Sequence, residues 1–421
     1  MEKMQNNTLT LCRWKVAIAA VAVHLCIGSV YAWSVFVKPL QLMYDWTKQD
    51  LTWTFSIAIV VLGLSAALSG SWMENKGPHR SAQISALAFG LGIIGAGVAS
   101  HIGSLWLLYL TYGVLGGIGL GLGYISPVST LVKWFPDKRG LATGMAVFGF
   151  GAGSLITGPI AADLIENLGV PGTFYILGFA YLAIIFAASS FLYFPPEGYK
   201  PEGWDPNKSA EAGKGFCTKR NFEVSEALKT PQFWLLWILF FINISAGIML
   251  ISLASPMAQE IVGFTPIQAG FMVGLMGIFN GAGRIFWSSV SDYIGRAVTY
   301  GIMFLVQIVL FILLPSLKTA ILFQLAFFII LTCYGGGFAT CPAFIADMFG
   351  ASRVGAIHGI ILTAWSSAGI FGPIFGAYIR EHTKSYCIAL YAISGALFAA
   401  LICTLFIYFI LRRLSFEERN N

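Results

Sequence analysis

Twelve apolar runs, each long enough to cross a lipid bilayer as an α-helix, divide this sequence into alternating apolar and polar segments. A bilayer offers the backbone no hydrogen-bond partners, so runs of this length are expected to form helices that satisfy their own backbone. We therefore predict an all-α membrane protein with twelve transmembrane helices. The runs lie at about residues 14–37, 51–73, 81–100, 104–132, 140–163, 172–194, 231–254, 267–290, 297–316, 319–345, 354–379 and 385–411.

The composition excludes an ordinary soluble protein. Apolar residues make up 57% of the chain and charged residues 10%, with a mean hydropathy of +0.77. The seven cysteines are scattered without paired spacing, and no Ser/His/Asp, His-Glu-x-x-His or Cys-x-x-Cys arrangement occurs. We expect no enzyme, no cofactor, no metal site and no nucleic-acid partner, and we expect the chain to work as a monomer.

One long hydrophilic stretch, residues 195–230, separates the first six runs from the last six. It is rich in Pro, Gly, Lys and Glu, as linkers are. We predict an N-terminal six-helix bundle at 1–194, a linker at 195–230 and a C-terminal six-helix bundle at 231–421. Lys and Arg concentrate on the side of the bilayer that holds both termini and the linker, and the positive-inside rule places that side in the cytoplasm of a cell-membrane protein.

Three landmarks recur in the same order in both halves of the chain. The segment GSWMENKG that follows the second run matches SSVSDYIGR at the end of the eighth run. The matching residues are Glu74 with Asp292, Gly140 and Gly144 with Gly355 and Gly359, and Gly158-Pro159 with Gly372-Pro373. This order implies two six-helix bundles related as parallel repeats, with a substrate site between them near the bilayer midplane.

One arginine lies deep inside an apolar run. Arg284 precedes Asp292, the first acidic residue of the following loop, by about 12 Å of helix, since a helix rises about 1.5 Å per residue. At helical spacing it shares a face with Asn280, Ser288 and other small or polar residues. A charge among lipid tails costs several kcal/mol, so we interpret Arg284 as a functional cation that faces a cavity or a partner. A purely structural arginine is the alternative. All 19 acidic residues lie in loops or at helix ends, so its counter-charge should come from elsewhere.

The twelve runs, their division into six and six, and the repeated loop motif resemble the major facilitator superfamily over the whole chain. Closer matches are GSVYAWSVFVKPL in the first run, KWFPDKRGLATG before the fifth, TPQFW opening the seventh and NGAGRIFWSSVSDYIGR in the eighth. Together these segments resemble the oxalate/formate antiporter family and, more distantly, the monocarboxylate transporters. The resemblance implies gating loops with Glu74, Arg80, Asp292 and Arg296, although Glu74 stands where the family motif has an aspartate.

The resemblance also implies a substrate-binding arginine on the eighth helix, which Arg284 matches. In the oxalate exchanger, a lysine on the eleventh helix is the second cation, and Trp365 occupies that position here. One buried cation suits one carboxylate, so we expect a small monocarboxylate such as lactate, pyruvate or formate rather than oxalate. Asn280, one turn before Arg284, could donate a hydrogen bond to the same anion. In monocarboxylate transporters this position is an aspartate that takes part in proton coupling.

Further polar and aromatic residues are weaker candidates. Lys38 matches a lysine that monocarboxylate transporters use for substrate and proton entry, but an interfacial lysine is the alternative. His24 could take part in proton coupling, or it could be a helix-interior histidine with satisfied hydrogen bonds. The aromatic substrate-site candidates, for each of which helix packing is the alternative, are Tyr31, Tyr124, Tyr334 and Trp365.

These features predict a secondary transporter that moves a small carboxylate with a proton or in exchange for another anion. An oxalate:formate antiporter is the alternative within this class. An anion channel or a carboxylate sensor without transport is the alternative from another class, although a channel would require a ring of basic residues.

Overall fold

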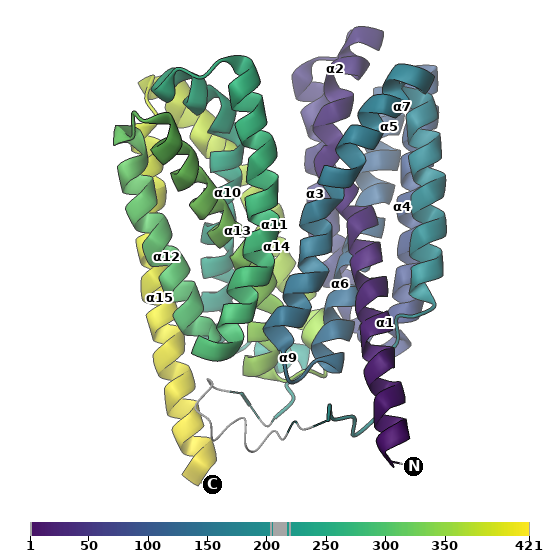
Figure 1. Cartoon of the computed structure of the whole chain (residues 1–421), viewed down its shortest axis with the longest axis vertical. Helices are drawn as coiled ribbons and strands as arrows, with labels where there is room; N and C mark the ends of the chain where they lie inside the picture. Colours follow the sequence, from purple (N-terminus) through teal and green to yellow (C-terminus); the bar gives the residue numbers. More distant parts are fainter. Residues whose placement is uncertain (1, 203, 205–216, 219, 421) are drawn as a thin grey trace. The chain divides into compact units, whose positions relative to one another are not determined.

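The described part of the chain is built from helices alone. The computed structural model describes residues 2–202, 204, 217–218 and 220–420, and no strand occurs among them. This confirms the all-α prediction. The elements (Figure 1) are α1 (Glu2–Gly28), η1 (Ser29–Trp33), α2 (Ser34–Met43), α3 (Lys48–Lys76), α4 (Pro78–Ile102), α5 (Leu105–Leu108), η2 (Tyr109–Leu115), α6 (Gly116–Trp134), α7 (Arg139–Ser189), α9 (Val224–Ala227), α10 (Pro231–Val262), α11 (Pro266–Ile294), α12 (Arg296–Leu313), η3 (Leu314–Ser316), α13 (Ala320–Phe349), α14 (Val354–Thr383) and α15 (Cys387–Asn420).

Eleven stretches of helix in the described residues are long and apolar enough to span a membrane. The twelve predicted runs correspond to these eleven because α7 covers both 140–163 and 172–194. The backbone leaves the helical conformation at Gly169, where φ is 71°, and Pro171 follows. Glycine adopts this left-handed value without the steric penalty of a side chain. The fifth and sixth spans are therefore joined by a kink rather than by a polar loop.

Two spans change their helix type part-way. In the first span, a 3-10 segment, η1, separates α1 from α2 and carries Tyr31 and Trp33. The indole nitrogen of Trp33 donates a hydrogen bond to the carbonyl oxygen of Leu51 at 2.9 Å, which fixes this segment against α3. In the fourth span, a π-helical segment, η2, lies between α5 and α6. Segments of this kind occur often at functional sites in helical proteins.

By its internal contacts the chain divides into two compact units. Unit 1 consists of Met1–Trp204 and Ala351–Ser366, and unit 2 consists of Asp205–Gly350 and Ser367–Asn421. Helix α14 thus contributes its first part to unit 1 and its remainder to unit 2. The limits predicted from the sequence, 1–194, 195–230 and 231–421, stay a prediction.

Close helix packing organises each unit. In unit 1, α7 packs along α1 and α4, and in unit 2, α11 packs along α13 and α12 along α15 (Figure 1). Gly28 allows the contact between α1 and α7, because a Cβ atom there would lie 2.1 Å from the carbonyl oxygen of Phe150. Small residues of this kind let helices in membranes approach each other closely.

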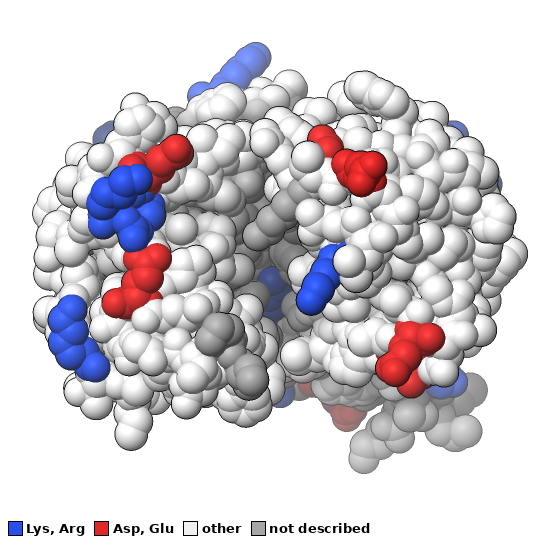
Figure 2. Space-filling model, turned by 90° about the horizontal axis from the view of Figure 1, so that it is seen from above, with Lys and Arg blue, Asp and Glu red and all other residues white. Residues whose placement is uncertain are grey.

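Charged side chains are sparse at the helix ends that lie uppermost in Figure 1. Figure 2 shows this face, on which basic and acidic residues form small separate patches among other residues. On neither unit do the described residues of this face form a continuous basic patch.

Candidate functional site

Arg284 lies near the middle of α11 and is 1% exposed. Its Nε donates a hydrogen bond to Oδ1 of Asn280, one turn earlier, at 3.3 Å. Its guanidinium carbon lies 5.4 Å from the ring centroid of Phe338 on α13, a distance at which an aromatic ring attracts a cation. Asn280 is half-buried. The structure therefore places a buried cation beside a side-chain amide that can donate from its nitrogen, a combination suited to a carboxylate.

The space for this arginine depends on a glycine of α13. A Cβ atom at Gly335 would lie 2.2 Å from the backbone oxygen of Asn280 and 3.1 Å from Cγ of Arg284. Gly335 has no feature in the local sequence that distinguishes it from the neighbouring glycines. Its neighbours on α11 become visible only when the two helices are packed together.

We expect Gly335→Ala to destabilise the protein by about 1–3 kcal/mol, as overpacking does. The backbone oxygen of Asn280 cannot move aside as the end of a flexible side chain could. The measurement is the midpoint of thermal unfolding in detergent. Gly395→Ala in α15 is the matched control, because nothing lies within 4 Å of a Cβ atom there. Equal midpoints for the two variants would contradict the close approach at Gly335.

Tyr334 belongs to the same unit as Arg284. Its side chain is 2% exposed, and its ring lies 5.3 Å from that of Phe338, the residue that also faces the guanidinium. The ring packs against Gly247 of α10, where a Cβ atom would lie 2.1 Å from it. The structure thus brings Arg284 and Tyr334 to the same ring, Phe338, in unit 2, and Asn280 accepts a hydrogen bond from the arginine.

The other aromatic candidates gather in unit 1. Tyr124 on α6 and Trp365 on the first part of α14 are fully buried, with ring centroids 5.7 Å apart. The ring centroid of Phe150 on α7 lies 5.2 Å from that of Tyr124, 5.6 Å from that of Trp365 and 5.3 Å from that of half-buried Tyr31. These four residues form one aromatic cluster, which we call the Tyr124 cluster.

The two proton-coupling candidates differ in their surroundings. Lys38 on α2 is exposed. His24 on α1 is completely buried and stacks on Tyr124, with ring centroids 5.1 Å apart. A second buried histidine, His358 on α14, also contacts the Tyr124 ring. The two rings are tilted relative to each other, with their centroids 5.9 Å apart. Sequence reasoning missed His358, because only the fold brings α14 to α6.

Glu74 at the end of α3 joins three elements of unit 1. Its Oε1 accepts hydrogen bonds from the Ser129 hydroxyl and from the backbone N–H of Gly355, both at 2.7 Å. Its Oε2 forms an ion pair with Lys133 of α6. Gly355 lies in the first turn of α14, where backbone N–H groups and the helix dipole favour a negative charge.

Unit 2 has a corresponding group of ion pairs at the ends of its helices, but its central residue is basic, whereas Glu74 is acidic. Arg296 at the start of α12 forms ion pairs with Asp292 at 2.7 Å and with Asp347 of α13 at 2.9 Å. Lys133 lies shortly before Gly140, and Asp347 lies shortly before Gly355, the glycines that recur in both halves, so the repeat itself was the signal for both residues. Arg80 of α4, the remaining gating candidate, is exposed.

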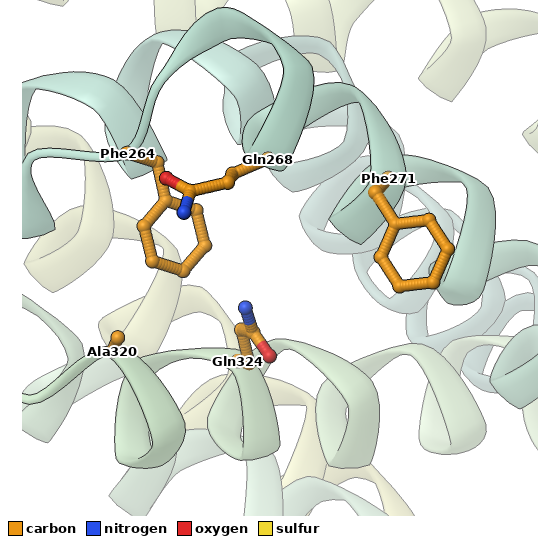
Figure 3. A pocket seen from close by; sticks show the side chains of 5 residues that line it. All are labelled: Phe264, Gln268, Phe271, Ala320 and Gln324. Carbon is orange, nitrogen blue, oxygen red and sulfur yellow. The ribbon is translucent and has the colours of Figure 1, made fainter.

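A hollow of about 480 Å³ lies elsewhere in unit 2, beside the first turns of α11 and α13. Figure 3 shows the amide groups of Gln268 and Gln324 on opposite sides of it, with Phe264 and Phe271 alongside. The Gln268 oxygen accepts a hydrogen bond from the backbone of Thr265 and so completes the cap of α11. Among the described residues, no charged side chain lines this hollow, and Arg284 lies outside its lining.

Eleven apolar stretches, a buried arginine and ion-pair clusters repeated at helix ends define a polytopic α-helical membrane protein. The chain belongs to the Major Facilitator Superfamily, whose family model matches residues 19–373 and 236–420. Fold and family together make it a membrane transporter of small molecules rather than an enzyme, and they confirm the predicted fold class.

Individual relatives confirm the narrower resemblance. The chain is 28% identical over 387 residues to the oxalate:formate antiporter of Oxalobacter formigenes, covering 90% of this chain and 87% of that one. It is 26% identical over 411 residues to monocarboxylate transporter 12 of Xenopus laevis, covering 93% and 87%. The crystal structure of the human organic anion transporter MFSD10 has the same fold, with a TM-score of 0.73, 13% identity, and coverage of 93% of this chain and 99% of that one.

Proposed function

We propose that this protein is a secondary transporter of small carboxylates, and that its substrates are monocarboxylates such as lactate, pyruvate or formate. The observation that carries the proposal is Arg284, a buried guanidinium that contacts Asn280 inside a membrane-spanning helix. A guanidinium grips a carboxylate through two parallel hydrogen bonds, and the neighbouring amide can add a third. The similarity to an oxalate:formate antiporter and to monocarboxylate transporters supports this substrate class.

The identity of residue 365 supports a monocarboxylate over oxalate. Trp365 is an uncharged, buried member of the Tyr124 cluster, whereas the resemblance to the oxalate exchanger implies a lysine at this position. A dianion such as oxalate carries a second carboxylate, and Trp365 offers it no cation. Burying that unpaired negative charge is costly. An oxalate:formate antiporter remains the competing proposal.

We propose alternating access as the transport mechanism, with Glu74, Arg80, Asp292 and Arg296 in the gating loops. Glu74 forms an ion pair with Lys133 of α6 and accepts a hydrogen bond from the first turn of α14. The hydrogen bond to α14 must break if α14 moves away from α3. We propose that both termini and the 195–230 linker lie in the cytoplasm, because Lys and Arg concentrate in these segments of the sequence. We further propose that the protein acts as a monomer in the cell membrane.

Exchange of internal for external substrate should run faster than net uptake. When no proton binds with it, one carboxylate at Arg284 lowers the net charge of the carrier by one, and a charge crosses the low-dielectric part of the membrane at high cost. The loaded carrier should therefore reorient more readily than the empty one. Tracer uptake into proteoliposomes, with and without unlabelled internal substrate, measures this difference.

The same assay separates the competing classes of protein. A channel would pass the tracer without stimulation by internal substrate, and a sensor would bind the substrate without any uptake. Internal substrate that left the initial rate unchanged would refute the exchange prediction. Protein-free liposomes are the control for passive entry of the undissociated acid.

A further inference from the structure

The two ring nitrogens of His24 both face oxygen atoms that can only accept hydrogen bonds. Nδ1 lies 2.5 Å from the backbone carbonyl oxygen of Ala146 on α7, and Nε2 lies 3.1 Å from that of Tyr124 on α6. A neutral imidazole has one N–H group and one lone pair, so it can donate to only one of these oxygens. An imidazolium ion donates to both. The backbone of unit 1 is thus arranged to receive the protonated form.

The packing around His24 restricts its ring from turning away. A Cβ atom at Gly149 would lie 3.0 Å from Cβ of His24, so α7 approaches α1 closely at this level. One face of the imidazole stacks on Tyr124, and the Phe150 ring is steeply inclined to the imidazole, with the two ring centroids 6.1 Å apart. Aromatic rings attract a cation placed over their faces. When the proton leaves, a lone pair of His24 must face a carbonyl oxygen, and a hydrogen bond between helices is lost.

His358 has the opposite surroundings. It is completely buried, and neither of its ring nitrogens meets a hydrogen-bond partner in the described part of the chain. Among the described residues, the Tyr124 ring of α6 stacks on His24, and His358 of α14 contacts the same tyrosine ring and interacts electrostatically with His24. A proton on His358 would add a second positive charge with no acceptor. The pair is therefore suited to hold one proton, on His24.

We propose that His24 is the site at which this carrier binds a proton for transport, with the carbonyl oxygens of Ala146 and Tyr124 as its acceptors and His358 as the neutral partner. The proposal rests on the proposed carboxylate transport and names its coupling ion. A proton from water on one side of the membrane binds the lone pair of neutral His24, and it leaves to water on the other side. Burial disfavours the charged ring while the two carbonyl groups favour it, and a site that must load and unload needs such opposing effects.

The direct test is the protonation state of His24 in the full-length protein. Histidine labelled with ¹⁵N in both ring nitrogens can be followed by NMR in lipid nanodiscs as the pH changes, with the His24→Gln variant to assign the signal. We expect His24 to pass from one protonated nitrogen to two as the pH falls, while His358 stays neutral. A His24 ring that stays neutral as the pH falls from about 8 to about 5, the range in which an unperturbed imidazole gains its proton, would overturn the proposal, and so would protonation of His358 instead.

The second test is proton-driven accumulation. An inward gradient of one pH unit should accumulate a labelled monocarboxylate up to about tenfold in proteoliposomes, because one unit corresponds to a factor of ten in proton concentration. His24→Gln should lose this accumulation and keep exchange between internal and external substrate, whereas His101→Gln, at an exposed position, should keep both. Accumulation that persists in His24→Gln would overturn the proton site. Failure of the native protein to move any monocarboxylate, while His24 still titrates, would refute the proposed substrate alone.

Discussion

The Arg284→Lys variant is expected to take up a labelled monocarboxylate about 10- to 100-fold more slowly than the native protein. Lysine keeps the charge, but its ammonium group cannot form the two parallel hydrogen bonds that a guanidinium offers to a carboxylate. One hydrogen bond to a charged group contributes about 1.5–3 kcal/mol, and 1.4 kcal/mol corresponds to a factor of ten. The contact from Nε to Asn280 would be lost as well. The measurement is initial uptake at matched amounts of reconstituted protein.

Arg412→Lys provides the matched control, because Arg412 is an exposed residue near the end of α15. This variant should transport at the native rate. Native-like uptake by Arg284→Lys, with the same affinity for the monocarboxylate, would remove Arg284 from the substrate site and with it the main support for the proposed function.

Trp365→Lys should shift the preference of the carrier from monocarboxylates toward dicarboxylates such as oxalate or malonate. The substitution supplies a basic group at the position where the oxalate exchanger is expected to have one. The new ammonium group would lie beside the rings of Tyr124 and Phe150, which can partly stabilise a cation. The measurement is competition by unlabelled oxalate or malonate against a labelled monocarboxylate, and we expect at least about tenfold stronger competition than in the native protein.

Trp365→Met is the matched control for this experiment. Methionine is unbranched like lysine and leaves a similar gap among the aromatic rings, but it carries no charge. Both variants should lose stability, because removing a buried tryptophan costs several kcal/mol. Only the lysine variant should gain affinity for dicarboxylates. If neither variant or both variants gained it, the inference from charge number would be wrong.

Span positions could be predicted from the sequence because hydropathy and length are local properties. The helix ends were predicted less well where the chain turns without a polar loop. Between 163 and 172 the sequence suggested a connection between two runs, yet the structure continues the helix up to a single kink at Gly169. Asp163 and Glu166 therefore lie on helical turns instead of in a loop.

Contacts between helices that are distant in the sequence could not be predicted from its periodicity. The relation of Arg284 to Asn280 follows from their spacing of one helical turn, but the approach of Phe338 and Gly335 depends on how α13 packs against α11. The same holds for His358, which reaches Tyr124 only because the first part of α14 belongs to unit 1. Periodicity identifies a buried face, whereas the partner of that face is set by tertiary packing.

The kink at Gly169 bears on how the chain enters the membrane. Only one residue, Gly169, leaves the helical conformation between the fifth and sixth spans. We therefore expect the two spans to enter the bilayer together as a helical hairpin, and not as two segments separated by a polar loop. Asp163 and Glu166 on the last turns before the kink would then cross the hydrocarbon layer together with the apolar residues of both spans. Membrane insertion of this protein should accordingly be most sensitive to substitutions in that hairpin, and such substitutions would act before any transport cycle begins.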